Sequence, residues 1–402
     1  MQQDKLEAAT IMREAREIEG EIIKTRRELH SNPELSYKEF QTSKFVAEKL
    51  KQLGIEVKTG VGGTGVVGIL RGSRSGKVVG LRADMDALPV KEEVDLPFKS
   101  KNEGVMHACG HDTHVAMLLG AAKILARHKK DLGGVVKFLF QPAEEDGGRG
   151  GAMPMIEDGA LENPKVDNVF GLHIGYPYLS GTFAVKPGAA MAAPDGFKIT
   201  IKGKGGHGSE PNATIDPIFI SAQVINAIQG ISSRMIKQTE PFVISVCSIH
   251  SGTKDNIIPD NAYLEGTIRT LDEKTRARAK KLLKKVVEST CKTFGAKCDL
   301  AFVKDAYPVT YNDPKITRQV MGLLKTLKNG TRTVEAEAIL GGEDVSRFLQ
   351  LAPGTYYWLG TVNKAKNCVY PNHSSKFKVD EDVLKYGTAS LALIALEFTK
   401  EN

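Results

Sequence analysis

Residues 107–146 read HACGHDTHVAMLLGAAKILARHKKDLGGVVKFLFQPAEED, and this stretch decides the fold class. Its middle part, Val115 to Ala126, places apolar residues at helical spacing. The later run Val135 to Phe140 is short, apolar and rich in β-branched and aromatic residues, which is typical of a buried strand. A helix followed by a buried strand, with a polar cluster before one and after the other, indicates an α/β sheet.

The same pattern extends in both directions from this stretch. Further strands are expected at Val66 to Leu70, Val78 to Leu81, Val169 to Ile174 and near Tyr356 to Leu359. Amphipathic helices are expected up to about His30, over Phe40 to Leu53 and over Val383 to Phe398. The chain should therefore begin with two helices and close with one, around an α/β core.

A different pattern begins after Pro187. Phe197 to Ile201 alternates, a glycine cluster follows, and helical patterns flank Phe242 to Ile249 and Tyr263 to Ile268. This βαββαβ-like order predicts an α+β domain inserted into the first one, because strand signals like those of the opening sheet return later. The predicted ranges are 1–187 plus 309–402 for the first domain and 188–308 for the insert.

The composition describes an ordinary globular protein. A length of 402 residues predicts two or three domains, and a net charge of +7 is modest. The densest basic run, Arg276 to Lys285, carries apolar residues at helical spacing and no interleaved aromatics, so we expect a solvated helix face and no nucleic-acid binding. The longest apolar stretches fall far short of the roughly 20 residues that span a bilayer, which predicts no membrane segment.

The cysteines and the N-terminus bear on the compartment. Five cysteines are an odd number, and their spacing suggests no disulfide framework. The first residues carry acids and bases where a secretory signal needs an apolar stretch. We therefore expect the protein to be located in the reducing cytoplasm.

The densest polar cluster is His107 to His114, directly before the expected helix. Asp112 is a plausible N-cap there. Residues before a cap are usually extended, so Cys109 and His111 can point to the same side and reach one metal ion. The alternative is a buried thiol beside histidines that cap or pack.

Two adjacent carboxylates, Glu144 and Glu145, follow the expected strand Val135 to Phe140, at the edge where open α/β sheets bind ligands. Neighbouring side chains in an extended segment diverge, so one could ligate a metal while the other faces the substrate as a proton shuttle. A solvated acidic turn is the alternative.

Other candidates are more isolated. His173 closes an apolar strand and His373 lies in a polar loop, where a core histidine and a surface histidine are the alternatives. Asp84 and Asp86 follow another strand and could orient ligating histidines from behind, or form a turn.

The expected insert contributes three more candidates. His207 lies in a glycine-rich turn that has neither the spacing of a phosphate-binding loop nor that of a dinucleotide fingerprint. Asn256 and Arg269 could offer an amide and a guanidinium to a carboxylate, and a structural role for each is equally open.

Taken in order, eight segments resemble the co-catalytic metallopeptidase family that contains the aminoacylases. They are Arg82 to Pro89, Met106 to Gly120, Gln141 to Ala152, Gly171 to Ile174, Gly203 to Glu210, Asp255 to Pro259, Gly341 to Phe348 and Tyr370 to Phe377. The resemblance covers nearly the whole chain and is greatest to the branch of hippurate hydrolases, auxin-conjugate hydrolases and thermostable carboxypeptidases, with the last most similar in overall pattern.

The resemblance implies a fold and an activity. It implies a mixed-sheet, zinc-peptidase-like catalytic domain and an inserted ferredoxin-like lid domain that also forms a homodimer. The implied activity is hydrolysis of the amide bond beside a free amino-acid carboxylate, in small peptides or N-acyl amino acids.

The resemblance also implies residue roles. Cys109 bridges two metal ions, with further ligands His111, Glu145, His173 and His373. Glu144 is the general base, and Asp84 and Asp86 support the ligands. His207 reaches across the dimer to the neighbour's oxyanion, while Asn256 and Arg269 bind the substrate carboxylate.

Ligand chemistry limits which metals could bind but leaves more than one open. The wider family bridges its metals with an aspartate and has a histidine where this chain has Asp84, so Cys109 fits the narrower branch. A mixed set of thiolate, imidazole and carboxylate suits two zinc ions, and cobalt, nickel or manganese could use the same ligands.

Two other functions are compatible with the same residues. Cys109 could be the nucleophile of a cysteine hydrolase, which would be indifferent to chelators. The chain could also be a non-catalytic metal-binding or carboxylate-binding relative, which would be expected to have lost Glu144 or a ligand.

Overall fold

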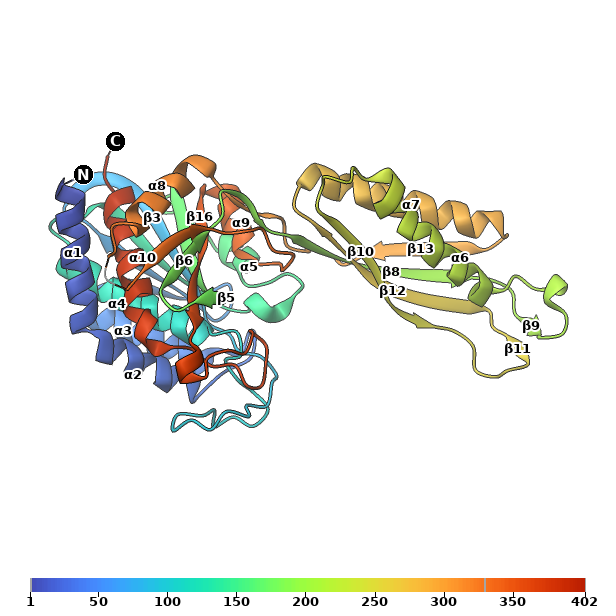
Figure 1. Cartoon of the computed structure of the whole chain (residues 1–402), viewed down its shortest axis with the longest axis horizontal. Coiled ribbons are helices and arrows are strands. Elements are labelled where there is room, and N and C mark those ends of the chain that lie inside the picture. The colour runs from blue at the N-terminus through green and yellow to red at the C-terminus, as the bar shows by residue number, and fades with distance from the viewer. Residues whose placement is uncertain (1, 329, 402) are drawn as a thin grey trace. The chain divides into compact units, whose positions relative to one another are not determined.

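The computed structural model describes residues 2–328 and 330–401, which form two compact units (Figure 1). The first unit takes in the chain up to Ala190, then Tyr311–Glu337, then the chain from Asp344 onward. The second unit comprises Met191–Thr310 and Ala338–Glu343. The predicted insert, 188–308, differs from the main segment of the second unit by a few residues at each end, and the short return 338–343 was not predicted.

The first unit is built on an eight-stranded sheet in the order β1-β2-β4-β3-β5-β16-β6-β15. Its strands are β1 (Glu56–Val61), β2 (Gly65–Arg71), β3 (Arg74–Asp84), β4 (Gly133–Gln141), β5 (Asn168–Leu179), β6 (Thr182–Val185), β15 (Arg332–Glu335) and β16 (Gly354–Val362). The central strands β4, β3, β5 and β16 are parallel to one another, whereas β2 and β6 run antiparallel to their neighbours β4 and β16. The predicted α/β class with a mixed sheet is confirmed.

Helices accompany this sheet. They are α1 (Gln2–Glu17), α2 (Glu19–His30), α3 (Phe40–Gln52), α4 (His111–Arg127), α5 (Ala152–Glu157), α8 (Pro314–Leu324), α9 (Val345–Leu351) and α10 (Leu384–Phe398). Figure 1 shows α1, α2, α3, α4 and α10 grouped together on one side of the strands. Helix α4 is buried from His111 through Ala122, because α2, α10 and β3 all pack on it. This enclosure fixes the helix that begins at the polar cluster.

The opening of the chain differs from the prediction. A break at Ile18, whose φ is −100° and ψ is 7°, divides the first predicted helix into α1 and α2. The break lets α1 pack on α10 while α2 packs on α4. Periodicity indicates which face is apolar but does not detect a one-residue break, so the prediction of two opening helices was wrong by one.

The second unit has the order β8 (Ala193–Lys202), α6 (Pro217–Gly230), β10 (Phe242–His250), β12 (Asn261–Thr270), α7 (Glu273–Thr293) and β13 (Lys297–Phe302). Its antiparallel sheet runs β10-β12-β8-β13, which is the ferredoxin-like arrangement. The expected basic helix is α7, which buries Ala279, Leu283 and Val287 and leaves most of its lysines exposed. A small extra sheet pairs β9 (Gly206–His207) with β11 (Ile257–Ile258).

The remaining short strands are β7 (Gly188–Met191) and β14 (Thr310–Asn312). Among the described residues, none of the helices is both long enough and apolar enough to cross a membrane.

Candidate metal centre

Parallel strands bring the candidate residues to one edge of the first unit's sheet. Asp84 ends β3, and it lies in register with Gln141, the last residue of β4. His173 lies on β5, which pairs with β3 on its other side. Loops that leave the carboxyl ends of neighbouring parallel strands meet at one edge, so their side chains converge there.

The Cys109-Gly110-His111 segment is a turn into a helix and is not extended as predicted. Gly110 has φ +85°, and a Cβ atom on it would lie 2.1 Å from Cδ1 of Ile174, so this position requires glycine. His111 is the first residue of α4. The left-handed turn, rather than strand alternation, directs both ligand side chains into the site.

The predicted N-cap was wrong. Gly110 occupies the N-cap position of α4, and Asp112 lies in the first turn of the helix. Its buried carboxylate pairs with Nε of Arg26 and contacts Nδ1 of His30, both at 2.8 Å. Asp112 therefore ties α4 to α2.

The five predicted ligands come together in two groups that share Cys109. One group is Cys109, His111 and His173, and the other is Cys109, Glu145 and His373. Within each group the possible ligand atoms lie within 4.8 Å of one another. Sγ of Cys109 lies 3.4 Å from Nε2 of His173, and Nε2 of His373 lies 3.2 Å from Oε1 of Glu145. A shared thiol between two groups is the arrangement that a bridging ligand requires.

Two of the histidines are oriented so that Nε2 faces this cluster. Nδ1 of His111 lies 3.2 Å from Oδ1 of Asp86, and Nδ1 of His173 lies 2.6 Å from the carbonyl oxygen of Ile174. Acceptors at Nδ1 place a proton there and direct Nε2 towards the cluster, as in most metal-binding histidines. Nε2 of His111 is buried and forms no hydrogen bond with any described residue, and the buried Oε1 of Glu145 pairs with Nε2 of His373 at 3.2 Å. These atoms fit a divalent cation.

The electrostatics of the cluster keep protons on two of the candidate ligands. Burial and the Glu145 carboxylate raise the pKa of the Cys109 thiol. Hydrogen bonds to Cys109 and Glu145 raise the pKa of His373 to about 10. The cluster therefore holds protons on groups that would have to lose them to ligate, so metal binding should release protons.

Asp86 connects two of the candidate ligands. Its Oδ1 contacts His111, and its Oδ2 accepts hydrogen bonds from the Glu145 N–H at 2.9 Å and the Ser36 hydroxyl at 2.7 Å. One buried carboxylate thus contacts a candidate ligand from α4 and a candidate ligand from the loop after β4. The supporting role of Asp86 stays a prediction, with which these contacts are compatible.

Asp84 contacts His114, a histidine that was not among the predicted site residues. Its Oδ1 lies 2.5 Å from Nδ1 of His114, whose Nε2 accepts the Ile174 N–H at 2.9 Å. Both ring nitrogens of His114 are therefore occupied, which makes it a structural histidine. On its other side, Asp84 pairs with the buried Arg82 at 2.6 Å.

The two adjacent glutamates are not in an extended segment. They begin a 3-10 helix, Glu144–Asp146, that follows Ala143 at φ +51°. Possible ligand atoms of Glu144, Glu145 and His111 lie within 4.8 Å of one another. The carboxylates are therefore close neighbours at the site rather than on opposite faces.

The loop that carries His373 is attached to the Cys109 turn. The His373 N–H donates to the carbonyl of Ala108 at 2.8 Å, and the side-chain amide of Asn372 donates to the carbonyl of Cys109 at 3.1 Å. The side chain of His373 is 55% exposed, so this is the side on which the cluster is open to solvent. Asn372 was not predicted, although it directly precedes a predicted ligand.

The second unit holds the other three candidates. His207 and Asn256 are exposed and adjacent, because the pairing of β9 with β11 places Ile257 opposite His207. The Ser209 N–H donates to Nδ1 of His207 at 3.2 Å, which leaves Nε2 to carry a proton outward. Arg269 is half-buried near the far end of β12, eight residues beyond Asn261, or roughly 25 Å along the strand. The unit therefore joins His207 with Asn256 but not with Arg269.

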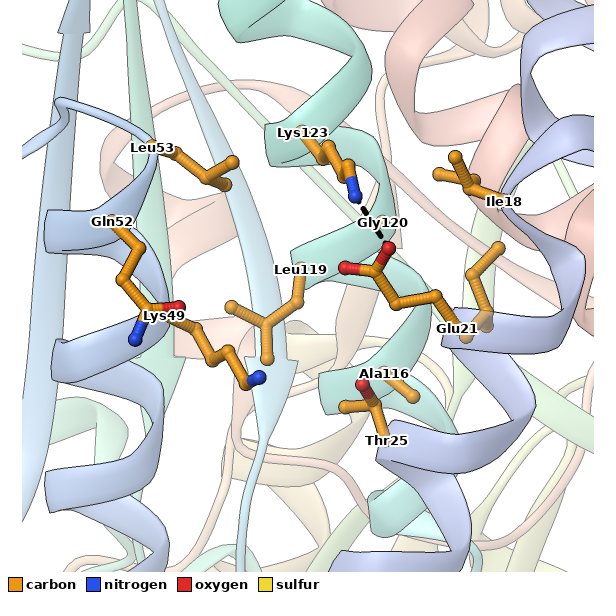
Figure 2. A pocket seen from close by; sticks show the side chains of 11 residues that line it. Ile18, Glu21, Thr25, Lys49, Gln52, Leu53, Ala116, Leu119, Gly120 and Lys123 are labelled. Carbon is orange, nitrogen blue, oxygen red and sulfur yellow. Dashed lines mark hydrogen bonds and ion pairs between the residues drawn. The ribbon is translucent and has the colours of Figure 1, made fainter.

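A pocket of about 250 Å³ lies elsewhere in the first unit, between α2, α3 and α4 (Figure 2). Leu53, Leu119 and the Glu21–Lys123 ion pair are among its lining groups. None of the candidate metal ligands lines it.

An α/β fold with a thiol, imidazoles and carboxylates converging at the carboxyl edge of its sheet defines a metal-dependent hydrolase. Residues 80–397 match the model of peptidase family M20/M25/M40, and the chain belongs to this family.

Relatives and a solved structure agree with this assignment. The chain is 58% identical over 389 residues to thermostable carboxypeptidase 1 of Saccharolobus solfataricus, covering 96% of this chain and 98% of that protein. It is 38% identical to an N-acetylcysteine deacetylase of Bacillus subtilis, covering 94% and 98%. The YxeP protein of Bacillus subtilis, a dinuclear metal-binding peptidase, has a structure that superposes with a TM-score of 0.82 at 35% identity, covering 95% of this chain and 99% of that one.

Proposed function

We propose that this hydrolase removes the C-terminal residue of small peptides or the acyl group of N-acyl amino acids, by cutting the amide bond beside a free carboxylate. The observation that carries the proposal is the pair of ligand groups sharing Cys109, with Glu144 beside them. Relatives named as a carboxypeptidase and as an N-acetylcysteine deacetylase both act on amides in which the amide nitrogen belongs to an amino acid.

The ligands would be Cys109, His111, Glu145, His173 and His373, holding two divalent ions, for which zinc fits the mixed donor set. When bound, such ions lower the pKa of water and polarise the scissile carbonyl. Asp86 holds His111 and the backbone of Glu145 in place, and Asp84 holds His114 against β5.

Glu144 is the proposed general base. Its carboxylate lies within 4.8 Å of possible ligand atoms of His111 and Glu145. Neither group that includes Cys109 needs Glu144 to be complete. It is only 8% exposed, so a proton taken from water would stay on Glu144 until the leaving nitrogen accepts it. Positioned proton transfer of this kind contributes roughly 10²- to 10⁴-fold to rate.

The second unit is proposed to act as a lid and as the dimerisation domain of a homodimer. Nε2 of His207 is free to donate to a developing oxyanion, and Arg269 and Asn256 are suited to a substrate carboxylate. Because His207 and Asn256 lie far from Arg269 in one chain, the proposal assigns Arg269 to one copy and the other two to its partner. All five cysteines are free thiols, which fits action in the reducing cytoplasm.

The test is hydrolysis of benzyloxycarbonyl-dipeptides, benzoyl-glycine and N-acetyl amino acids by the purified chain. We expect a chelator to abolish cleavage and added zinc to restore it, and the Glu144→Gln variant to keep its metal while losing turnover. Cleavage that persists in chelator would favour Cys109 as a nucleophile. Tight metal binding without cleavage of any compound would favour a binding protein.

A further inference from the structure

We propose that Glu39 is a positioning residue that holds the turn carrying Glu144, so that turnover depends on the length of the Glu39 side chain. The proposal rests on the assignment of Glu144 as the general base. It extends that assignment to the loop between α2 and α3, which contributes no metal ligand.

Glu39 is completely buried, and its carboxylate accepts three hydrogen bonds. Oε1 accepts the Ala143 N–H at 2.8 Å and the Tyr37 N–H at 3.0 Å, and Oε2 accepts the Thr64 hydroxyl at 2.5 Å. The Ala143 contact joins residues 104 positions apart in the chain. Glu39 is therefore a direct link between the N-terminal helices and the residue that precedes Glu144.

Glu39 does not serve the helix that it begins. It occupies the N-cap position of α3, where an acidic side chain usually accepts N–H groups of the first turn, yet it forms no such bond. Glu34 accepts those bonds instead, from the Gln41 N–H at 3.1 Å and the Thr42 N–H at 2.9 Å. Because Glu34 satisfies the first turn of α3, the Glu39 carboxylate is available for Ala143.

The backbone at Ala143 needs such support. Its φ of +51° lies in the left-handed region, which a residue with a Cβ atom rarely adopts unless its surroundings impose it. Asp86 accepts the N–H of Glu145 two residues later. The two buried carboxylates thus hold the turn on either side of Glu144, and Glu39 holds the strained residue.

The experiment compares Glu39→Asp with Glu39→Gln. Aspartate keeps the charge but withdraws the acceptor by one methylene, whereas glutamine keeps the reach and can still accept both N–H groups and donate to Thr64. A displacement of about 1 Å at the base should lower kcat roughly 10- to 100-fold in Glu39→Asp. We expect KM and metal content to stay near the wild-type values, and Glu39→Gln to retain most of the wild-type kcat.

Glu34→Asp is the matched control, because it shortens a carboxylate of the same loop that accepts two N–H groups away from the site. It should lower the thermal midpoint without lowering kcat. An equal loss of kcat in Glu34→Asp, an unchanged kcat in Glu39→Asp, or a loss of metal in Glu39→Asp would each overturn the role of Glu39.

A double-mutant cycle separates this proposal from the assignment of Glu144. In a Glu144→Asp background, where the base is already displaced, adding Glu39→Asp should lower kcat by less than about threefold, because both changes act on one carboxylate. Full additivity would overturn positioning through Glu144. High turnover by Glu144→Gln would instead overturn the base assignment, whatever Glu39→Asp does.

Discussion

At the scale of single residues, Cys109 is the group on which the site depends, because both candidate ligand groups include it. We expect Cys109→Ala, loaded with zinc and desalted, to retain less than half of the metal that the wild type retains, as measured by plasma mass spectrometry. Cys247→Ala, which removes an exposed thiol of the second unit, should retain all of it. Wild-type metal content in Cys109→Ala would exclude Cys109 as a shared ligand.

Asp86 allows a second test at this scale, because it contacts two of the proposed ligands and is not itself proposed as one. An Asp86→Asn variant cannot accept from both the Glu145 N–H and His111, so metal affinity should fall roughly 10- to 100-fold. Competition with a chromophoric chelator measures this affinity. Ser36→Ala removes a hydroxyl that donates to the same carboxylate, and it should change affinity by much less. Equal losses in the two variants would mean that the carboxylate only fills space.

The sequence predicted the residue types of the site better than their geometry. Thiol, imidazole and carboxylate groups after successive strands indicate a metal because few other functions need that combination. Backbone conformation was harder to predict from the sequence. The turns at Gly110 and Ala143 are left-handed, but both segments were expected to be extended. Long-range partners could not be predicted at all, since nothing near Asp112 or Ala143 in the sequence indicates a contact with Arg26 or Glu39.

At the scale of secondary-structure elements, Asp195 attaches β8 to α7. Its buried carboxylate lies 2.7 Å from Nε of Arg276 and 2.6 Å from Nζ of Lys280. Burial alone would raise the pKa of Asp195, but the hydrogen bonds and charges of Arg276 and Lys280 lower it below the ordinary value. The stability that this group contributes is therefore present above the unfolded pKa of about 3.9 and lost as pH falls through the folded pKa.

We expect Asp195→Asn to be less stable than the wild type by about 2 kcal/mol or more at pH 7, because two cations lose their buried partner. The difference between the two proteins should begin to shrink as pH falls below about 4, where Asp195 of the unfolded wild-type chain takes up a proton, and should vanish only below the lowered pKa of the folded state. Urea unfolding followed by circular dichroism at pH 7, 5, 4 and 3 measures it. Asp299→Asn, which removes an exposed carboxylate paired with Lys202, should lower the stability at pH 7 by less than about 1 kcal/mol. A difference for Asp195→Asn that is constant with pH would contradict the charge pairing.

Elements were predictable where their pattern was strong. The buried strands β2, β4 and β5 and the helices α4 and α10 matched the apolar runs, because burial on both faces or one continuous stripe leaves a clear signal. The strands β1 and β15 were missed because they lie at the two ends of the sheet and are mostly exposed or half-buried. An edge strand of that kind carries too few apolar residues to be distinguished from a loop.

At the scale of the whole molecule, the change of pattern after Pro187 revealed an insert because the order of strands and helices changes along with it. The return of residues Ala338–Glu343 to the second unit was not predictable. This segment is six residues long, contains two adjacent glycines and has no periodicity. A crossing this short is specified by the contacts it makes in the folded unit rather than by its own sequence.

The division of the chain into two units predicts how the protein responds to removal of its metal. The proposed ligands all belong to the first unit, so a metal present at 100 times its dissociation constant should stabilise that unit by about 2.7 kcal/mol. Trp358, the single tryptophan of the chain, lies on β16 opposite His173 and reports on the same unit. We expect a chelator to lower the midpoint of the fluorescence transition by about 5 °C or more.

Hydrogen exchange locates the effect. Chelation should speed amide exchange in β5 and α4, whereas exchange in β8 and β12 of the second unit should stay unchanged, and adding zinc back should reverse the change. The internal control is this second unit, which contains none of the proposed ligands. Faster exchange in β8 and β12, with unchanged exchange in β5 and α4, would contradict a metal site in the first unit. The reason is that a ligand protects the segments whose native contacts it completes.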